Sequence, residues 1–210
     1  MSSYAYQPSL LDLAEPGPAL GPLAGRVRHE LAGGAWVDVL PGWVRGSGEV
    51  LEVLLGDIGW RAERRKMYDS EVDVPRLLRW YGAGAGLPHP ILTAAREELS
   101  AFYAEELGEP FLTAGLCLYR DGRDSVAWHG DRHGRGSTQD TMVAIVSFGD
   151  VRPLVLRPTG GGQAIRFPSG PGDLVVMGGS CQRTWEHAIP KTARPCGPRV
   201  SVQFRPRGVS

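Results

Sequence analysis

Hydrophobic positions follow two different periods along the chain, one before and one after residue 110. From Ile91 to Leu107, apolar residues recur every three or four positions with glutamates between them, which predicts an amphipathic helix that Gly108 stops. From Phe111 onward, short alternating segments are separated by Gly-rich turns, which predicts strands. The strands are expected at 112–119, 125–128, 141–148, 152–157, 163–167, 173–177, 184–187 and 198–205. Eight short strands at this spacing are typical of a sandwich or barrel, so we expect a mostly β fold with flanking helices (α+β) and an antiparallel jelly-roll core.

The part of the chain before residue 90 has weaker patterns. Residues 1–25 are rich in Pro, Gly and Ala and are interpreted as an N-terminal arm, loosely ordered or draped over the domain. Ala35–Val44 alternates and then breaks at a Pro-Gly pair, which predicts a strand and a turn. Ser47 is placed to cap a helix that continues to Ile58. Residues 61–90 have little periodicity, and we interpret them as mostly loop.

Composition indicates one domain of ordinary size. The chain has 210 residues, 42% hydrophobic and 22% charged, so residues 26–210 are expected to form a single domain. No apolar run reaches the roughly 18 residues of a membrane span, and the N-terminus does not have the pattern of a secretory signal. Three cysteines without a CxxC pair argue against a disulfide framework. We therefore expect a cytoplasmic protein, a monomer without membrane contact.

Charge is balanced overall but unevenly distributed. The formal net charge is zero, which gives no global argument for nucleic-acid binding. After Asp173 the only acidic residue is Glu186, whereas basic residues are frequent and include Arg183, which we expect near a substrate. A second basic cluster lies at 61–66. Such local patches can contact phosphates, although a solvated basic surface has the same pattern.

A metal site is indicated by the pair His129 and Asp131 with His187 further along the chain. Residues i and i+2 of a strand point to the same face, so one strand end can offer an imidazole and a carboxylate to one ion. Two histidines and a carboxylate on one face of an octahedral ion leave open positions, the arrangement of non-haem Fe(II) oxygenases. The alternative is an ordinary polar strand end, with His187 bonded to backbone.

His133 offers a second way to complete a ligand set, because His129, Asp131 and His133 alternate. The Gly-rich sequence that follows predicts a loop, and a loop is poorly suited to fix metal geometry. We therefore interpret His133 as a substrate-side or surface residue.

The C-terminal strand predicted at 198–205 has one apolar and one polar face. The polar face carries Arg199, Ser201, Gln203 and Arg205. An arginine fork matches a carboxylate with two parallel hydrogen bonds, which indicates a site for a small dicarboxylate cofactor next to the metal. The alternative is an edge strand with surface arginines.

Aromatic side chains next to arginines form a third candidate site. In the segment 74–82, Arg76, Trp80 and Tyr81 have the character needed to stack on a base and contact phosphates; the alternative is a hydrophobic pin that fastens a loop to the core. Trp128 and Trp185 alternate with ligand positions and are expected in the core.

Five segments in order, PRLLRWYG, LYRDGRDSVAWHGD, IVSFGDVRPLVLR, GDLVVMGGSCQRTWEHAIPK and PRVSVQFRP, cover about Pro75 to Pro206. Together they resemble the AlkB-type Fe(II)/2-oxoglutarate-dependent dioxygenases of nucleic-acid repair. The resemblance implies a double-stranded β-helix core at about 110–206, preceded by N-terminal helices and a nucleotide-recognition lid at about 60–90. It implies oxidative demethylation by O2 of bases such as 1-methyladenine and 3-methylcytosine in alkylated DNA, single-stranded or with a flipped base. The products would be formaldehyde, succinate and CO2.

The resemblance also assigns roles to single residues. His129, Asp131 and His187 match the iron ligands, and Tyr119, Arg199 and Arg205 match residues that bind or border 2-oxoglutarate. Cys117 and Ser201 stand at cosubstrate-side positions where the family usually has asparagine. Arg76, Trp80, Tyr81, His133 and Arg183 are the expected substrate residues. Past Asp131 the family's acidic residues are absent, so the same chemistry on RNA, protein or a small molecule stays open, as does a non-catalytic binding module.

Overall fold

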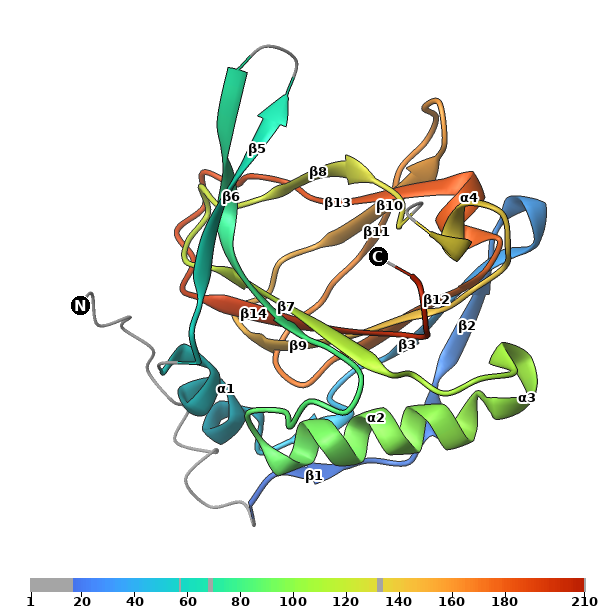
Figure 1. The fold of residues 1–210 in the computed structure, drawn as a ribbon, viewed down its shortest axis with the longest axis horizontal. Helices are drawn as coiled ribbons and strands as arrows, with labels where there is room; N and C mark the ends of the chain where they lie inside the picture. The colour runs from blue at the N-terminus through green and yellow to red at the C-terminus, as the bar shows by residue number, and fades with distance from the viewer. Residues whose placement is uncertain (1–16, 57, 68–69, 132–133, 210) are drawn as a thin grey trace.

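The computed structural model describes residues 17–56, 58–67, 70–131 and 134–209, and it shows two antiparallel sheets that face each other (Figure 1). In spatial order, the major sheet contains β2 (Val27–Glu30), β3 (Ala35–Leu40), β12 (Leu174–Gly179), β9 (Val143–Gly149), β14 (Arg199–Arg205), β7 (Thr113–Tyr119), β6 (Ser70–Tyr81) and β5 (Arg61–Met67). The minor sheet contains β11 (Ile165–Phe167), β10 (Leu154–Pro158), β13 (Trp185–Ile189) and β8 (Val126–His129). All eight strands predicted after residue 110 are confirmed, with ends shifted by at most two residues.

Smaller elements complete the described chain. The α-helices are α1 (Ser47–Leu55), α2 (Pro90–Phe102), α3 (Ala104–Leu107) and α4 (Cys181–Thr184). A short sheet pairs β1 (Ala19–Leu20) with β4 (Val44–Arg45), and single 3-10 turns span Leu23–Gly25, Ala32–Gly34 and Arg135–Ser137. No helix within the described ranges is both long enough and apolar enough to cross a membrane.

The two faces of the major sheet bury different kinds of side chain. One face packs against α1 and α2, and on β14 it presents Val200, Val202 and Phe204 to the largest hydrophobic cluster. The other face looks towards the minor sheet, and there a second cluster includes Tyr119 and Trp185. Because side chains alternate along a strand, the polar residues of β14 necessarily lie on this second face, between the sheets.

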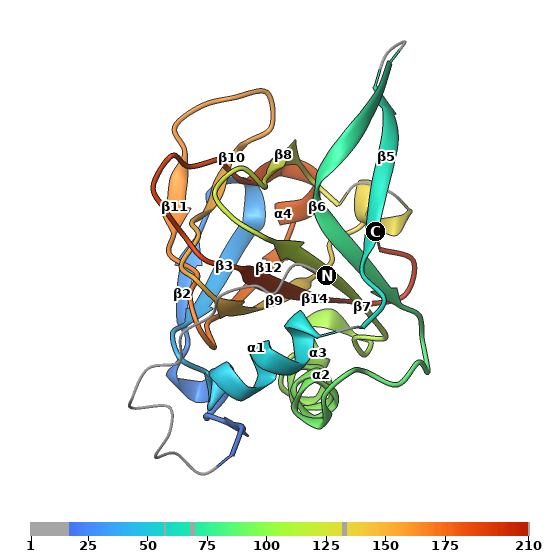
Figure 2. The same cartoon turned by 90° about the vertical axis from the view of Figure 1, so that its left-hand side faces the viewer.

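The expectation that residues 61–90 are mostly loop is wrong. β5 and β6 form a long antiparallel hairpin, and only the end of β6, from Leu77 to Tyr81, also pairs with β7. Figure 2 shows the rest of this hairpin extending beyond the sheets. The pattern was weak because only the paired end of β6 has a core on one side, where Leu77 and Tyr81 pack.

The structure describes the predicted N-terminal arm only in part. Residues 1–16 lie outside the described ranges, but residues 17–25 are part of the fold, since β1 pairs with β4 and Trp43 Nε1 donates to the Gly21 carbonyl at 2.8 Å. The helix predicted from Ser47 is present, but its N-cap is Gly46 in a left-handed conformation. It ends at Leu55 rather than Ile58.

The helix predicted over residues 91–107 is interrupted once. α2 begins after His89, whose Nδ1 accepts from the Ile91 N–H at 3.1 Å, and it breaks at Tyr103. The Tyr103 hydroxyl donates to the buried carboxylate of Asp38 at 2.8 Å, and its ring belongs to the main core cluster. α3 then ends at Gly108 in the left-handed region, with φ 74°, as predicted.

Candidate metal centre and cosubstrate site

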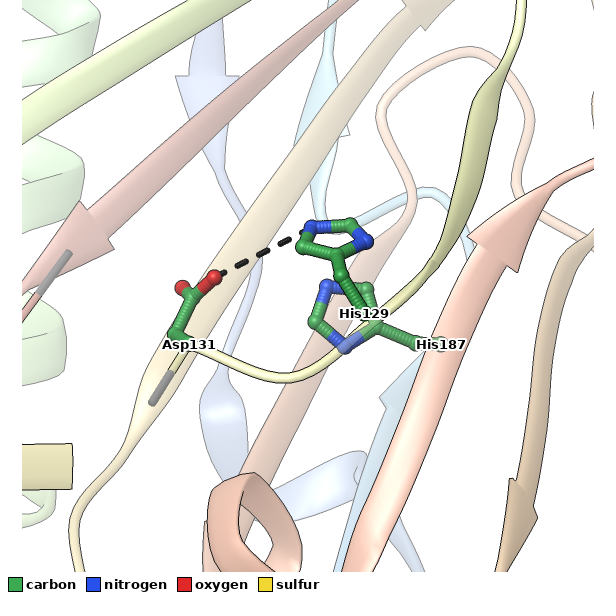
Figure 3. A group of neighbouring side chains, drawn as sticks. All are labelled: His129, Asp131 and His187. Carbon is green, nitrogen blue, oxygen red and sulfur yellow. Dashed lines mark ion pairs between the residues drawn. The ribbon is translucent and has the colours of Figure 1, made fainter. Parts of the chain in front are cut away.

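Three potential metal ligands come together where β8 ends. His129, the last residue of β8, is the direct register partner of His187 on β13, and their ring centroids are 4.2 Å apart. Asp131 follows two residues later, with its Oδ1 3.9 Å from His129 Nε2. The candidate ligand atoms of all three lie within 4.8 Å of one another, and Figure 3 shows the carboxylate turned towards the two imidazoles. The predicted grouping is confirmed.

Both imidazoles are in the form that binds a metal. Burial, together with the neighbouring His129 ring, lowers the pKa of His187 to about 3, and burial also lowers the pKa of His129. At neutral pH both rings are therefore uncharged. His129 Nδ1 lies 2.9 Å from the Ala127 carbonyl, so Nδ1 carries the proton and Nε2 has the free lone pair.

The Asp131 carboxylate is ionised and firmly held. Burial acts to raise its pKa, but the Arg205 guanidinium and the neighbouring His187 outweigh that effect and lower the pKa to about 2. Arg205 Nε donates to Oδ2 at 2.7 Å. The Asp131 main-chain N–H donates to Gln182 Oε1 at 3.1 Å. One carboxylate oxygen is thus fixed by Arg205, and the other is left facing the histidines.

Arg199 lies deeper between the sheets and is only 1% exposed. Its Nη2 donates to Ser147 Oγ at 2.8 Å, but Nε and Nη1 have no hydrogen-bond partner among the described residues. Buried donors of a charged group are costly to leave unpaired. A guanidinium with two free N–H groups has the geometry to bind a carboxylate, so this position fits one end of a small dicarboxylate.

Tyr119 lies directly across from Arg199 in the β14–β7 register, and the guanidinium carbon of Arg199 is 5.3 Å from its ring centroid. Burial raises the pKa of Tyr119 to about 12, with a further contribution from Cys117. The hydroxyl therefore keeps its proton and can donate a hydrogen bond. Together with Arg199, Tyr119 forms a buried site that fits one end of a small anionic cosubstrate.

A cleft of about 1150 Å³ opens over His129 and Asp131, whereas His187 lies behind them and is not among the lining residues. Its walls and floor include Arg61, Arg76, Leu78, Arg79, Trp80, Gly115, Cys117, Trp128, His129, Asp131, Lys191, Gln203 and Arg205. Gly115 lets side chains pack closely over it, because a Cβ there would come within 3.0 Å of Arg205 Nη1 and 3.2 Å of Gln203 Oε1. The cleft therefore joins His129 and Asp131 to a wall that is aromatic and, apart from Glu63, basic.

Only some of the predicted substrate residues line this cleft. Trp80, 50% exposed, lines it, as does Arg76, whose Nη1 also donates to the Ser125 carbonyl at 3.2 Å. Tyr81 does not line it, because alternation along β6 turns its side chain to the hydrophobic core. Arg183 is paired with Asp140 instead, and His133 lies outside the described residues.

The two tryptophans that were expected in the core lie in different environments. Trp185 is buried in the core, but the same expectation is wrong for Trp128, which is half-buried, lines the cleft and has Arg157 stacked at 4.2 Å on its ring. Cys117 and Ser201 lie side by side across the β7–β14 ladder. The Gln203 carboxamide bonds to both of their side chains, a bridge that neither residue signals in the sequence.

Sequence reasoning also missed Gln182 and Gly115. Gln182 holds the main chain of Asp131 from five residues before His187, and a single glutamine carries no pattern that would reveal this contact. Gly115 interrupts no alternation, so only the close approach of Arg205 and Gln203 shows why a side chain is absent there.

A sequence profile described as the 2OG-Fe(II) oxygenase superfamily matches residues 49–205. The chain belongs to this superfamily, and the residues described above fit its iron and 2-oxoglutarate: it is a 2-oxoglutarate- and Fe(II)-dependent dioxygenase. Within the superfamily it is a member of the AlkB homologue family.

Curated relatives agree with this placement, and a solved structure shares the fold. The human alpha-ketoglutarate-dependent dioxygenase alkB homolog 3 is 29% identical over 202 residues, 82% of this chain and 68% of the relative. The Arabidopsis thaliana DNA oxidative demethylase ALKBH2 is 33% identical over 134 residues, 52% and 42% of the two chains. The structure of OsALKBH1 has a TM-score of 0.59 at 13% identity, covering 86% of this chain and all of that one, which supports a double-stranded β-helix.

Proposed function

We propose that this dioxygenase demethylates N-alkylated nucleobases in DNA, of the 1-methyladenine and 3-methylcytosine type. The observation that carries the proposal is the cleft itself. It leads to His129 and Asp131 and presents the half-exposed indole of Trp80. Its border carries one acidic residue, Glu63, and four basic residues, Arg61, Arg76, Arg79 and Lys191. Aromatic faces stack on bases and arginine or lysine contacts phosphates. Relatives named DNA oxidative demethylase ALKBH2, from Arabidopsis thaliana and human, support the same substrate class.

The residues between the sheets would hold iron and cosubstrate in a fixed relation. His129, Asp131 and His187 would bind Fe(II), while Arg199 would pair with the far carboxylate of 2-oxoglutarate and Tyr119 would donate to it. When bound, iron and 2-oxoglutarate supply the oxidation of the alkyl carbon by O2, with succinate and CO2 as coproducts. The chain orients the reactants, keeps both imidazoles neutral, and holds the Asp131 carboxylate through Arg205.

A base inside a duplex cannot enter this cleft, so the target base must be flipped out or already unpaired. Residues of the β5–β6 hairpin line one wall of the cleft, and we assign this hairpin the role of a nucleotide-binding lid. Trp80 would stack on the base from this wall, and His129 lies at the opposite, metal-bearing side. The basic residues around the cleft would hold the phosphates on either side of the flipped nucleotide.

The proposal can be tested with the full chain, Fe(II), 2-oxoglutarate and O2. The substrates are matched oligonucleotides, DNA and RNA, each with one 1-methyladenine or 3-methylcytosine or without modification. Loss of the methyl group, followed by mass spectrometry, is expected for the methylated DNA and is absent in the Asp131→Ala variant. Succinate release without demethylation of any oligonucleotide would leave the dioxygenase intact and overturn the nucleobase assignment. Demethylation of RNA alone would move the substrate from DNA to RNA.

A further inference from the structure

The buried side chain of Arg152, just before β10, is neither a candidate metal ligand nor part of the cleft lining. It is 1% exposed, and its guanidinium donates to three main-chain carbonyl groups. The acceptors are Asp121 O at 3.0 Å, Asp124 O at 2.9 Å and Pro190 O at 2.7 Å. Burying a guanidinium is costly. The segments that carry the three acceptor carbonyls indicate what this buried arginine does.

The three carbonyls belong to the two segments that lead to the metal ligands. Asp121 and Asp124 precede β8, which ends at His129, whereas Pro190 follows β13, which carries His187. The same segments meet once more where the Thr192 N–H donates to the Gly122 carbonyl at 2.9 Å. Arg152 therefore joins the ends of the two ligand-bearing strands.

β8 and β13 pair directly at only two described positions. β8 and β13 match at His129 with His187 and at Val126 with Ile189, and the register is irregular between these two points. An irregular ladder leaves strand separation less constrained than a continuous one. The distance between the two imidazoles thus depends on contacts outside the ladder.

We propose that Arg152 is a positioning residue for the metal centre, which sets the separation of His129 and His187 by tying β8 to β13. Its guanidinium carbon also lies 5.8 Å from the ring centroid of Tyr119, so the same side chain supports the cosubstrate tyrosine. A planar guanidinium can serve carbonyls on two segments at once, whereas a lysine ammonium is a single point of donation. The role is thus specific to arginine.

The test is a Co(II) titration of the full-length metal-free chain, without nucleic acid, so its result does not depend on the proposed substrate. Arg152→Met is expected to weaken Co(II) binding roughly 10- to 100-fold, as loss of groups that orient metal ligands does, and to change the Co(II) absorption spectrum. Arg152→Lys should fall between that variant and the wild type. Arg28→Met is the matched control, because Arg28 pairs with Asp38 and Glu106 near the helices; it should lower the melting temperature and leave Co(II) affinity unchanged.

A destabilised Arg152→Met protein with wild-type Co(II) affinity and spectrum would overturn the proposal, because a merely structural arginine would behave in that way. If the Arg152→Met protein does not fold, Co(II) binding by the Arg152→Lys and Gly122→Ala variants tests the proposal instead. A methyl group at Gly122 would overlap the Thr192 carbonyl and spread the same two segments without touching Arg152. Weakened Co(II) binding in both variants supports the proposal, and wild-type affinity in both contradicts it.

Discussion

The two sides of the cleft differ in how their residues are held. On the buried side, Asp131 is held by Arg205 and Gln182, Arg199 is almost fully buried beneath it, and β7, β14 and β9 pair in continuous register. The β5–β6 wall pairs with the rest of the sheet only near its end and leaves Trp80 half exposed. The difference fits the proposed function, in which the buried side would fix the chemistry and the exposed wall would select the substrate.

The largest effect is expected from the buried side, at Asp131. Asp131→Ala removes the one anionic ligand and leaves Arg205 unpaired, so metal affinity should fall by more than about 100-fold, with no measurable turnover. A Co(II) or Fe(II) titration followed by a succinate assay checks this. Asp140→Ala is the control, since Asp140 is exposed and pairs only with Arg183 among the described contacts. Normal metal binding by Asp131→Ala would contradict the assignment of the ligands.

A somewhat smaller effect is expected from Arg199→Met, deeper on the buried side. Loss of the partner of a buried carboxylate costs about 2 kcal/mol or more, which corresponds to a KM for 2-oxoglutarate raised roughly 30-fold or more. Metal affinity should not change, because Arg199 contacts Ser147 and Ser169 rather than a ligand. Steady-state succinate kinetics give the KM. Arg157→Met is the control, because Arg157 lies outside the anion site. If Arg157→Met raised the KM for 2-oxoglutarate as much as Arg199→Met does, the role of Arg199 in binding the carboxylate would be contradicted.

The wall should give the next smaller effect, through Trp80. Trp80→Ala is expected to weaken binding of a methylated oligonucleotide about tenfold, or ~1.4 kcal/mol, because one stacking contact is lost. The KM for 2-oxoglutarate should remain unchanged, and so should the melting temperature. Fluorescence anisotropy with a labelled oligonucleotide measures the affinity.

Tyr81→Ala is the matched variant for Trp80→Ala, because adjacent residues of β6 face opposite ways. It should lower the melting temperature by removing core packing, while affinity for the oligonucleotide stays within about twofold of wild type. If Tyr81→Ala weakened binding as much as Trp80→Ala in a folded protein, the division of β6 into a cleft face and a core face would be wrong.

The smallest effect on catalysis is expected far from the cleft, at Asp38. Burial acts to raise the pKa of this carboxyl, but hydrogen bonds from Arg28, Tyr103 and Arg26 outweigh it and lower the pKa below its usual value. A carboxyl with a depressed pKa in the folded state stabilises above its unfolded pKa near 3.9, and this stabilisation is lost as pH falls through the folded pKa.

Asp38→Asn should therefore lower stability by about 3 kcal/mol at pH 7, and the difference from wild type should shrink below about pH 4. Urea unfolding at several pH values measures both, and turnover at pH 7 should be unchanged. A constant difference from pH 7 to pH 3 would contradict the ionised role of Asp38.

The contrast between the buried side and the wall also explains what the sequence could predict. The strands after residue 110 and the grouping of His129, Asp131 and His187 follow from alternation, because each of those strands has a core on at least one face. The hairpin at 61–81 could not be predicted in this way, since most of β6 pairs only with β5. Trp128 was wrongly expected in the core because its burial was inferred from the usual burial of tryptophan. Its side chain instead lines the cleft, which leaves it half-buried.

The contacts that hold the ligands are a different case. Gln182 and Arg152 act on main-chain groups, so their partners have no side-chain signature. Such contacts become visible only when the register of β8 against β13 is known.

The most direct test of the account is the ratio of the two products with matched oligonucleotides under single-turnover conditions. With a DNA oligonucleotide that carries 1-methyladenine or 3-methylcytosine, formaldehyde and succinate should form in equal amounts. With the unmodified oligonucleotide, succinate should form slowly and formaldehyde should be absent. Succinate formed at the same rate with both oligonucleotides, and no formaldehyde with either, would contradict the claim that this cleft selects a methylated base.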